Sequence, residues 1–198
     1  MMRFIETIKI ENGIAHNLDL HLERASKTCF HHFGVRTVLP FDKIINEIRS
    51  SHNEGIYKLR IIYAGKIEHY TIEKYQPKIV KTLKIVDGGN IDYSFKYEDR
   101  LPLNKLLDLR GDCDDIIIIK NGFVTDTSFS NLVFLDGGQL FTPASFLLNG
   151  IKRQQLLKDG KIKEKEISLE DINKYSKVFM INSMLDYSIG FFDAITSG

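Results

Sequence analysis

Hydrophobic and polar residues follow two different periods in the first third of the chain. Residues 5–10 alternate between apolar and polar and end at Asn12-Gly13, which predicts a strand closed by a two-residue hairpin turn. Asn17 and Gly34 are suited to begin and end a helix, and the residues between them carry one apolar stripe: Leu18, Leu22, Ala25 and Cys29. A shorter amphipathic helix and two strands follow, at Phe41–Ile48, 57–63 and 68–73. This order predicts an α+β layer.

Short strands and helices alternate in the rest of the chain. Asp87-Gly88-Gly89-Asn90 is the clearest break, so we expect an N-terminal α+β domain of residues 1–88 and a C-terminal domain of residues 89–198. The pattern then predicts helices at 103–109, 150–158 and 169–175, and strands at 115–120, 131–135, 139–142, 177–181 and 187–191. The second domain is therefore mixed α/β, and periodicity alone does not show whether its sheet closes into a barrel.

Composition gives no sign of a nucleic-acid-binding, metal-binding, membrane or secreted protein, and it does not indicate a reaction. The 198 residues carry a net charge of only +1, which gives no electrostatic reason to expect nucleic acid or an anionic membrane as a partner. Cys29 and Cys113 lie far apart and show no metal-ligand spacing, as in a reduced protein without a metal site. No apolar run is long enough to span a bilayer, and the N-terminal residues lack the apolar core of a signal peptide. We expect a soluble, cytoplasmic protein.

A lysine flanked by two aromatic residues is the first candidate for chemistry. Lys96 lies between Phe95 and Tyr97. An amine held against an apolar wall has a lowered pKa and becomes a nucleophile that can form a Schiff base. A surface lysine with its head group in water is the other interpretation, and from these three residues alone it is the favoured one.

Three further polar segments have both a functional and an ordinary structural interpretation. The run from Val124 to Asn131 is longer than a turn requires and is suited to holding a cofactor, but its residues also form good turns. In Asn149-Gly150-Ile151-Lys152-Arg153, the glycine begins a helix whose free N–H groups are suited to bind phosphate, although glycine is common at such positions. Asn182-Ser183, after an apolar strand, is a weaker candidate.

The order and spacing of these segments resemble the class-IV aminotransferases, the fold type IV family of pyridoxal phosphate enzymes. That family includes branched-chain and D-amino-acid aminotransferases and 4-amino-4-deoxychorismate lyase. The likeness runs from Phe4 nearly to the C-terminus: residues 4–9 with Asn12-Gly13 resemble the family's opening strand and turn, and His21-Leu22-Glu23-Arg24 resembles its first-helix motif. The resemblance implies a D-amino-acid aminotransferase-like α+β fold, with a small N-terminal α/β sandwich and a C-terminal mixed barrel-like domain.

The same resemblance implies a cofactor site for pyridoxal 5′-phosphate. Lys96 stands where the family has its catalytic Schiff-base lysine, and Asp126 stands where it usually has a glutamate that pairs with the pyridine nitrogen. The phosphate would be bound by the residues that match the family's phosphate motifs: Arg24, the backbone N–H groups of Ile151 and Lys152, and the turn at Asn182 and Ser183. Thr7 and Arg60 are the candidate substrate residues.

The resemblance leaves several functions open. The first is an aminotransferase that moves an amino group between an amino acid and a 2-oxo acid. The alternative is a 4-amino-4-deoxychorismate lyase that releases pyruvate and 4-aminobenzoate for folate synthesis, to which Thr7 and Asn182-Ser183-Met184 are somewhat closer. The aspartate at Asp126 and the absence of the N-terminal hairpin of longer members keep a third possibility open, a member that binds cofactor or metabolite without catalysis. By analogy we expect a homodimer.

Overall fold

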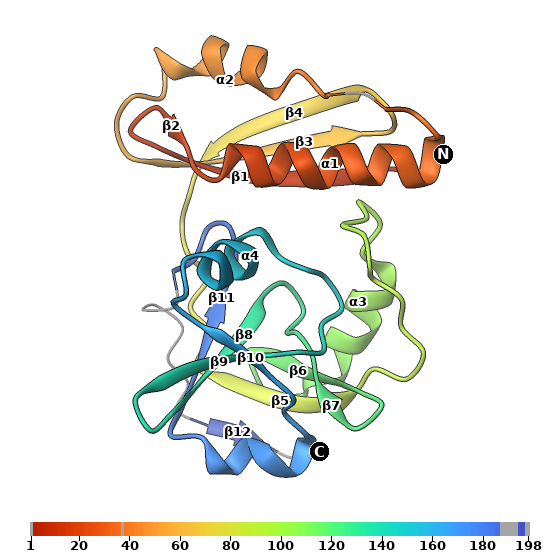
Figure 1. Cartoon of the computed structure of the whole chain (residues 1–198), viewed down its shortest axis with the longest axis vertical. Helices are drawn as coiled ribbons and strands as arrows, with labels where there is room; N and C mark the ends of the chain where they lie inside the picture. The colour runs from red at the N-terminus through yellow and green to blue at the C-terminus, as the bar shows by residue number, and fades with distance from the viewer. Residues whose placement is uncertain (1, 37, 187–193, 197–198) are drawn as a thin grey trace. The chain divides into compact units, whose positions relative to one another are not determined.

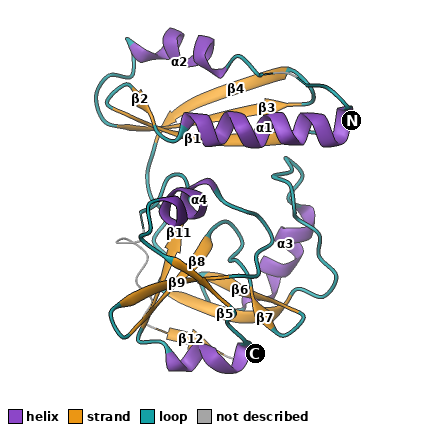
Figure 2. Ribbon diagram, in the orientation of Figure 1, coloured by secondary structure: helices purple, strands orange, loops and turns teal. Residues whose placement is uncertain are grey.

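The computed structural model describes residues 2–36, 38–186 and 194–196. They form two compact units, Met1–Pro77 with Phe95–Asp99 and Lys78–Ser94 with Arg100–Gly198 (Figures 1 and 2). The division differs from a boundary at residue 88, because strand β5 (Thr82–Asp87) pairs in parallel with β6 (Asp115–Lys120) and so belongs to the second unit. None of the described helices is both long enough and apolar enough to cross a membrane.

The first unit contains an antiparallel sheet with the strand order β2-β1-β3-β4. Its strands are β1 (Phe4–Glu11), β2 (Ile14–Ala15), β3 (Ile56–Tyr63) and β4 (Ile67–Lys74). Asn12 and Gly13 join β1 to β2 with φ angles of 50° and 76°, as a type I′ turn requires. The predicted hairpin turn is therefore confirmed.

Two helices pack against this sheet and share one core with it. They are α1 (Leu18–Phe33) and α2 (Phe41–Arg49), and the shared core includes Ile8, Ala25, Cys29, Ile44, Ile48 and Leu59. Gly34 ends α1 in the left-handed region, at φ 67°, and its N–H donates to the carbonyl of Phe30. Asn17 precedes α1 as predicted, but its side chain does not cap the helix because its own backbone is left-handed, at φ 53°.

A short segment far along the sequence, Phe95–Asp99, completes the first unit. The N–H of Ile5 donates to the carbonyl of Lys96 at 2.9 Å, and the N–H of Glu98 donates to the carbonyl of Arg3 at 2.9 Å. The segment therefore lies along the start of β1, and it places Lys96 in the same unit as α1.

The second unit contains two four-stranded sheets, with the orders β10-β9-β8-β11 and β12-β5-β6-β7. The strands not yet bounded are β7 (Phe123–Val124), β8 (Asn131–Asp136), β9 (Gln139–Pro143), β10 (Lys163–Lys165), β11 (Lys177–Ile181) and β12 (Ala194–Thr196). Pairing of the described strands does not close a barrel. The mixed α+β fold is confirmed, and the strand predicted at 187–191 lies outside the described residues.

The helices of the second unit are short. They are α3 (Leu101–Leu107), the 3-10 turn η1 (Asp108–Arg110), α4 (Ile151–Lys158) and η2 (Leu169–Lys174). The last is a 3-10 helix, and it lies within the helix predicted at 169–175. Its start is closed by a capping box in which Ser168 and Asp171 bind each other's backbone.

Candidate active site

The first unit buries a carboxylate beneath helix α1. Along β1 the side chains of Phe4, Glu6 and Ile8 alternate with those of the other face, so Glu6 points into the core shared with the helices. Its Oε2 accepts a hydrogen bond from His21 Nδ1 at 2.6 Å, and its two oxygens accept from Nε and Nη2 of Arg24 at 2.8 and 2.5 Å. Glu6 is fully buried, and this bidentate pair fixes the plane of the Arg24 guanidinium.

The charges of this cluster are set by burial and by one another. Burial alone would raise the pKa of Glu6, but the charge of Arg24 and the hydrogen bonds from His21 and Arg24 lower that pKa to about 2. Burial lowers the pKa of His21, opposed by Glu6 and assisted by the charges of Arg24 and Lys96. His21 is therefore neutral at pH 7, and its Nε2 is buried without a hydrogen-bond partner among the described residues.

The residues on both sides of Lys96 pack into an aromatic cluster, and Lys96 itself is half-buried. The ring of Phe95 lies 4.4 Å from that of His32, and the ring of Tyr97 lies 5.2 Å from that of Phe4, centroid to centroid. The Lys96 ammonium is close enough to His21 for its charge to lower the pKa of that imidazole, after the larger effect of burial. Sequence reasoning selected Lys96 and Arg24 but missed Glu6 and the role of His21, because a single acid in an amphipathic strand carries no special signal.

Thr7 and Arg60 are brought together on the opposite face of the same sheet. They are direct partners in the antiparallel pairing of β1 with β3, and therefore lie side by side on one face. Arg60 Nη2 lies 3.7 Å from Glu98 Oε1, and Glu98 Oε2 lies 2.5 Å from Arg3 Nε. Glu98 was not identified from the sequence. Arg60 is about one-third exposed and can meet a carboxylate from solution.

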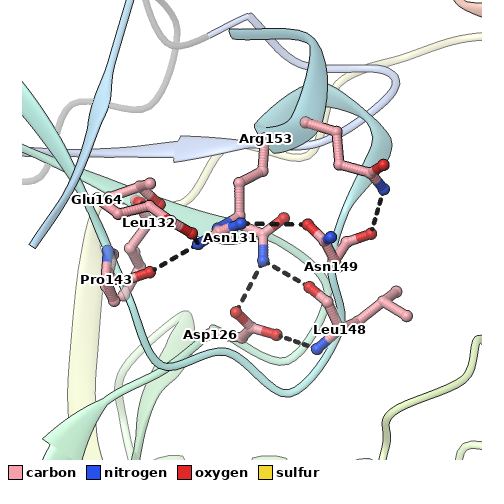
Figure 3. Close-up of polar contacts among 10 residues, drawn as sticks. Asp126, Asn131, Leu132, Pro143, Leu148, Asn149, Arg153 and Glu164 are labelled. Atoms are coloured by element: carbon pink, nitrogen blue, oxygen red, sulfur yellow. Dashed lines mark hydrogen bonds and ion pairs between the residues drawn. The ribbon is translucent and has the colours of Figure 1, made fainter. Parts of the chain in front are cut away.

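The second unit buries a second carboxylate, Asp126, which is drawn in Figure 3. Its Oδ1 accepts from Asn131 Nδ2 at 2.8 Å, and its Oδ2 accepts from the N–H groups of Leu147 and Leu148 at 3.1 and 2.9 Å. Burial raises the pKa of Asp126 to about 6, and these three hydrogen bonds and the charge of Arg153 oppose that rise. Three hydrogen bonds thus hold the carboxyl in place, and its pKa of about 6 lies close to neutral pH.

The start of helix α4 lies directly beside this acid. Asn131 Nδ2 also donates to the carbonyl of Leu148 at 2.9 Å, two residues before Gly150. A Cβ on Gly150 would lie 2.1 Å from Asn131 Oδ1, so only glycine fits at this position. None of the described side chains caps α4. The N–H groups of Ile151 and Lys152 therefore face the open end of the helix, where an anion is favoured. The Lys152 ammonium pairs with Asp186 at 2.6 Å.

Arg153 is a buried cation that the sequence analysis did not select as functional. Its Nη2 donates to the carbonyl of Pro143 at 3.1 Å and to Glu164 at 2.5 Å, and its Nη1 donates to Asn149 Oδ1 at 3.2 Å (Figure 3). The guanidinium also lies over the ring of Phe146, 4.4 Å from its centroid. These contacts anchor the loop that leads into α4.

Asn182 builds the turn that follows β11. Its Oδ1 accepts from the N–H groups of Met184 and Leu185 at 2.8 and 3.0 Å, and its Nδ2 donates to Ser130 Oγ at 2.9 Å. Ser130 is adjacent to Asn131, so this turn is tied to the segment that holds Asp126. Ser183 lies within the turn. Among the described residues, no group of three or more His, Cys, Asp or Glu side chains is placed to hold a metal ion.

Comparison with known proteins shows the family to which this chain belongs. The family model described as amino-transferase class IV matches residues 106–188. An uncharacterised protein of Haemophilus influenzae is 37% identical over 185 residues, which cover 93% of this chain and 98% of that protein. The chain belongs to the class-IV aminotransferase family, whose members depend on pyridoxal phosphate.

Two solved structures show the same fold. A Haemophilus somnus protein, provisionally described as a 4-amino-4-deoxychorismate lyase, is 38% identical, has a TM-score of 0.83 and is matched over 93% of this chain and 97% of its own. A Mesorhizobium loti protein, provisionally described as an amino-acid aminotransferase, is 19% identical with a TM-score of 0.80 over the full length of both chains. The second likeness supports the fold alone.

Proposed function

We propose that this protein is a pyridoxal phosphate-dependent aminotransferase that moves an amino group between an amino acid and a 2-oxo acid, with Lys96 as its Schiff-base lysine. The observation that carries the proposal is the pair formed by the buried Asp126 carboxylate and the uncapped start of α4, both held by Asn131. An acid suits the ring nitrogen of this cofactor, and an anion-binding helix end suits its phosphate.

The residues of the chain fit this cofactor. An ionised carboxylate has about four acceptor positions, and three of those on Asp126 are taken by described residues. The remaining position on Oδ1 is suited to accept a protonated ring nitrogen. Bound pyridoxal phosphate supplies an electron sink for charge that develops on the substrate carbon. Asp126 would keep the ring nitrogen protonated, and so keep that sink effective.

Phosphate binding is assigned to residues that offer N–H donors or positive charge. The N–H groups of Ile151 and Lys152 would donate to it, with Arg24 and the turn at Asn182 and Ser183 as further contacts. The bidentate bond of Glu6 to Arg24 uses Nε and Nη2 and holds the plane of the guanidinium. This gives Glu6 the role of orienting Arg24.

Lys96 would act twice: as the attachment point for the cofactor and as the base that moves a proton to and from the substrate carbon. An amine serves as a base only in its neutral form. The rings of Phe95 and Tyr97 pack against those of His32 and Phe4, which holds the backbone on both sides of Lys96. Thr7 and Arg60 are proposed to contact the substrate, with Arg60 as the partner of its carboxylate.

A second function is favoured by one specific observation. The Haemophilus somnus protein that is 38% identical over nearly the whole chain is provisionally described as a 4-amino-4-deoxychorismate lyase. The same lysine, acid and phosphate site would serve that reaction, in which pyruvate is released and 4-aminobenzoate remains. Both functions need a small carboxylate-bearing substrate, which Arg60 suits.

Reduction with borohydride tests the attachment at Lys96. The purified protein, supplied with pyridoxal phosphate, is expected to be yellow and to lose the colour on reduction, with cofactor mass fixed on the peptide that contains Lys96. Lys96→Arg retains the positive charge and is the matched control, which should give no fixed mass. Cofactor mass on any other peptide, or none on the wild type, would show that the proposal is wrong.

A substrate panel then separates the two reactions. Aminodeoxychorismate is tested for release of pyruvate, and L- and D-amino acids are tested with 2-oxoglutarate for amino transfer. Amino transfer supports the first function and pyruvate release the second. A protein that binds the cofactor and turns over none of these substrates would favour a binding role. Light scattering at the assay concentration tests the homodimer that we propose for the active form.

A further inference from the structure

We infer that Asn131 is the positioning residue that sets the Asp126 carboxylate and the start of helix α4 relative to each other, so that the two ends of the cofactor site are aligned by one side chain. The inference rests on the proposed function for its cofactor. Asn131 is the first residue of β8 and is buried, and it would not itself touch the reacting atoms.

Both donors of the Asn131 amide are used, one on each part of the site. One N–H of Nδ2 is directed to Asp126 Oδ1 at 2.8 Å and the other to the carbonyl of Leu148 at 2.9 Å (Figure 3). An amide nitrogen carries only two N–H groups. Both N–H groups of Asn131 are therefore used, and a shift of Asp126 or Leu148 would break one of these hydrogen bonds.

The oxygen of the same amide explains why a glycine precedes α4. The space in which Gly150 would carry a Cβ is filled by Asn131 Oδ1, only 2.1 Å from the ideal Cβ position. Gly150 has φ −67° and ψ 147°, a conformation open to any residue. The requirement for glycine therefore comes from Asn131 and not from the backbone conformation.

The backbone of Leu148 binds both Asp126 and Asn131. Its N–H donates to Asp126 Oδ2 at 2.9 Å while its carbonyl accepts from Asn131. Asp126, Asn131 and the peptide groups of Leu148 thus hold one another directly, two residues before Gly150. A displacement of the acid is transmitted to the helix start, where the phosphate would bind.

The first test is a pH titration of Asp126 in the protein without cofactor. The carbon NMR signal of its carboxyl group reports the titration. Asn131→Ala removes a hydrogen bond to the ionised form and should raise the Asp126 pKa, which lies at about 6, by about one unit. Asn131→Asp keeps the shape, adds a like charge and should raise it further. Thr142→Val is the control, because it removes another buried side-chain bond, to the carbonyl of Leu132, without touching Asp126.

The second test is a double-mutant cycle between Asn131 and Gly150. Binding of pyridoxamine 5′-phosphate is measured by calorimetry, because this form lacks the aldehyde and does not depend on Lys96 chemistry. Gly150→Ala alone should raise the Kd by about tenfold, but by less than about twofold when Asn131 is already alanine. Circular dichroism verifies that each variant is folded, and Asn131→Ser replaces Asn131→Ala if the latter is not.

These measurements distinguish the inference from the proposed function. Additive effects of the two substitutions, or an unchanged Asp126 titration in Asn131→Ala and Asn131→Asp, would overturn the inference even if Lys96 carries the cofactor. If wild-type protein does not bind pyridoxamine phosphate, the proposed function fails and the cofactor part of the inference fails with it. The titration in the cofactor-free protein still decides whether Asn131 holds Asp126.

Discussion

Glu6 holds Arg24 through two parallel hydrogen bonds, from Nε at 2.8 Å and from Nη2 at 2.5 Å. The acid belongs to strand β1 and the arginine to helix α1, so the pair joins the two layers of the first unit. Arg24 is the residue proposed to contact the cofactor phosphate. The direction of its guanidinium therefore depends on an acid that would never touch the cofactor.

Replacing Glu6 by glutamine should destabilise the protein strongly. The substitution keeps the shape but leaves the buried side of Arg24 and His21 without a negative partner, which typically costs on the order of 3 kcal/mol. Urea unfolding at pH 7 measures the loss in free energy of unfolding. Glu11→Gln is the matched control: Glu11 pairs with Lys9 and His16 nearer the surface, and its loss should cost no more than about 1 kcal/mol. Equal effects of the two substitutions would contradict the buried role of Glu6.

Stability should fall in acid in a way that depends on Glu6. Its pKa is about 2 in the folded protein, below its ordinary value of 4.5. The unfolded chain therefore takes up the proton first, and the stabilisation present above pH 4.5 is lost as the pH falls towards 2, on the order of 3 kcal/mol in total. His21, whose pKa is also lowered from 6.5, adds to this loss at higher pH. The free energy of unfolding is measured between pH 7 and pH 2. Below pH 4.5 it should depend less steeply on pH in Glu6→Gln than in the wild type, and an identical slope would contradict the assignment.

Arg60→Gln should weaken substrate binding without unfolding the protein. If Arg60 meets a substrate carboxylate, the KM should rise by about tenfold or more with a smaller change in kcat, because a charged hydrogen bond contributes about 1.5–3 kcal/mol. Lys58→Gln is the control on the same face of β3, where Lys58 pairs with Glu73. Steady-state kinetics of the active substrate measure both variants, and an unchanged KM in Arg60→Gln would remove Arg60 from the substrate site.

Arg153→Lys should weaken both the fold and the binding of the cofactor phosphate. Lysine keeps the charge but lacks the planar fork that binds Asn149, Pro143 and Glu164 at once. We expect a loss of about 2–3 kcal/mol in the free energy of unfolding, since one buried network is broken. Calorimetry with pyridoxamine phosphate should also show a weaker Kd, because the loop into α4 is loosened. Lys158→Arg, at the exposed end of the same helix, should change neither quantity.

Much of the fold and part of the site were predictable from local pattern. Helix α1, the hairpin at Asn12-Gly13 and the strands around Asn121-Gly122 follow from periods and turn residues that act within a few positions. The order of the motifs around Lys96, Asp126 and Gly150 was also sufficient to indicate the family, which comparison with relatives bears out. These features are local in the chain or are carried by the order of motifs along it, and need no knowledge of packing.

Only the tertiary structure decided which distant residues meet. It assigned β5 to the second unit, placed Phe95–Asp99 along β1, and buried Glu6 and Arg153 with their partners. It also brought Asn131 against both Asp126 and Gly150. Strand pairing and the burial of charge depend on contacts between residues far apart in sequence, and a side chain's identity does not state whether it will be desolvated or by what it will be neutralised. For this reason the sequence indicated the candidate site residues, and only the packed fold showed which residues hold them in place.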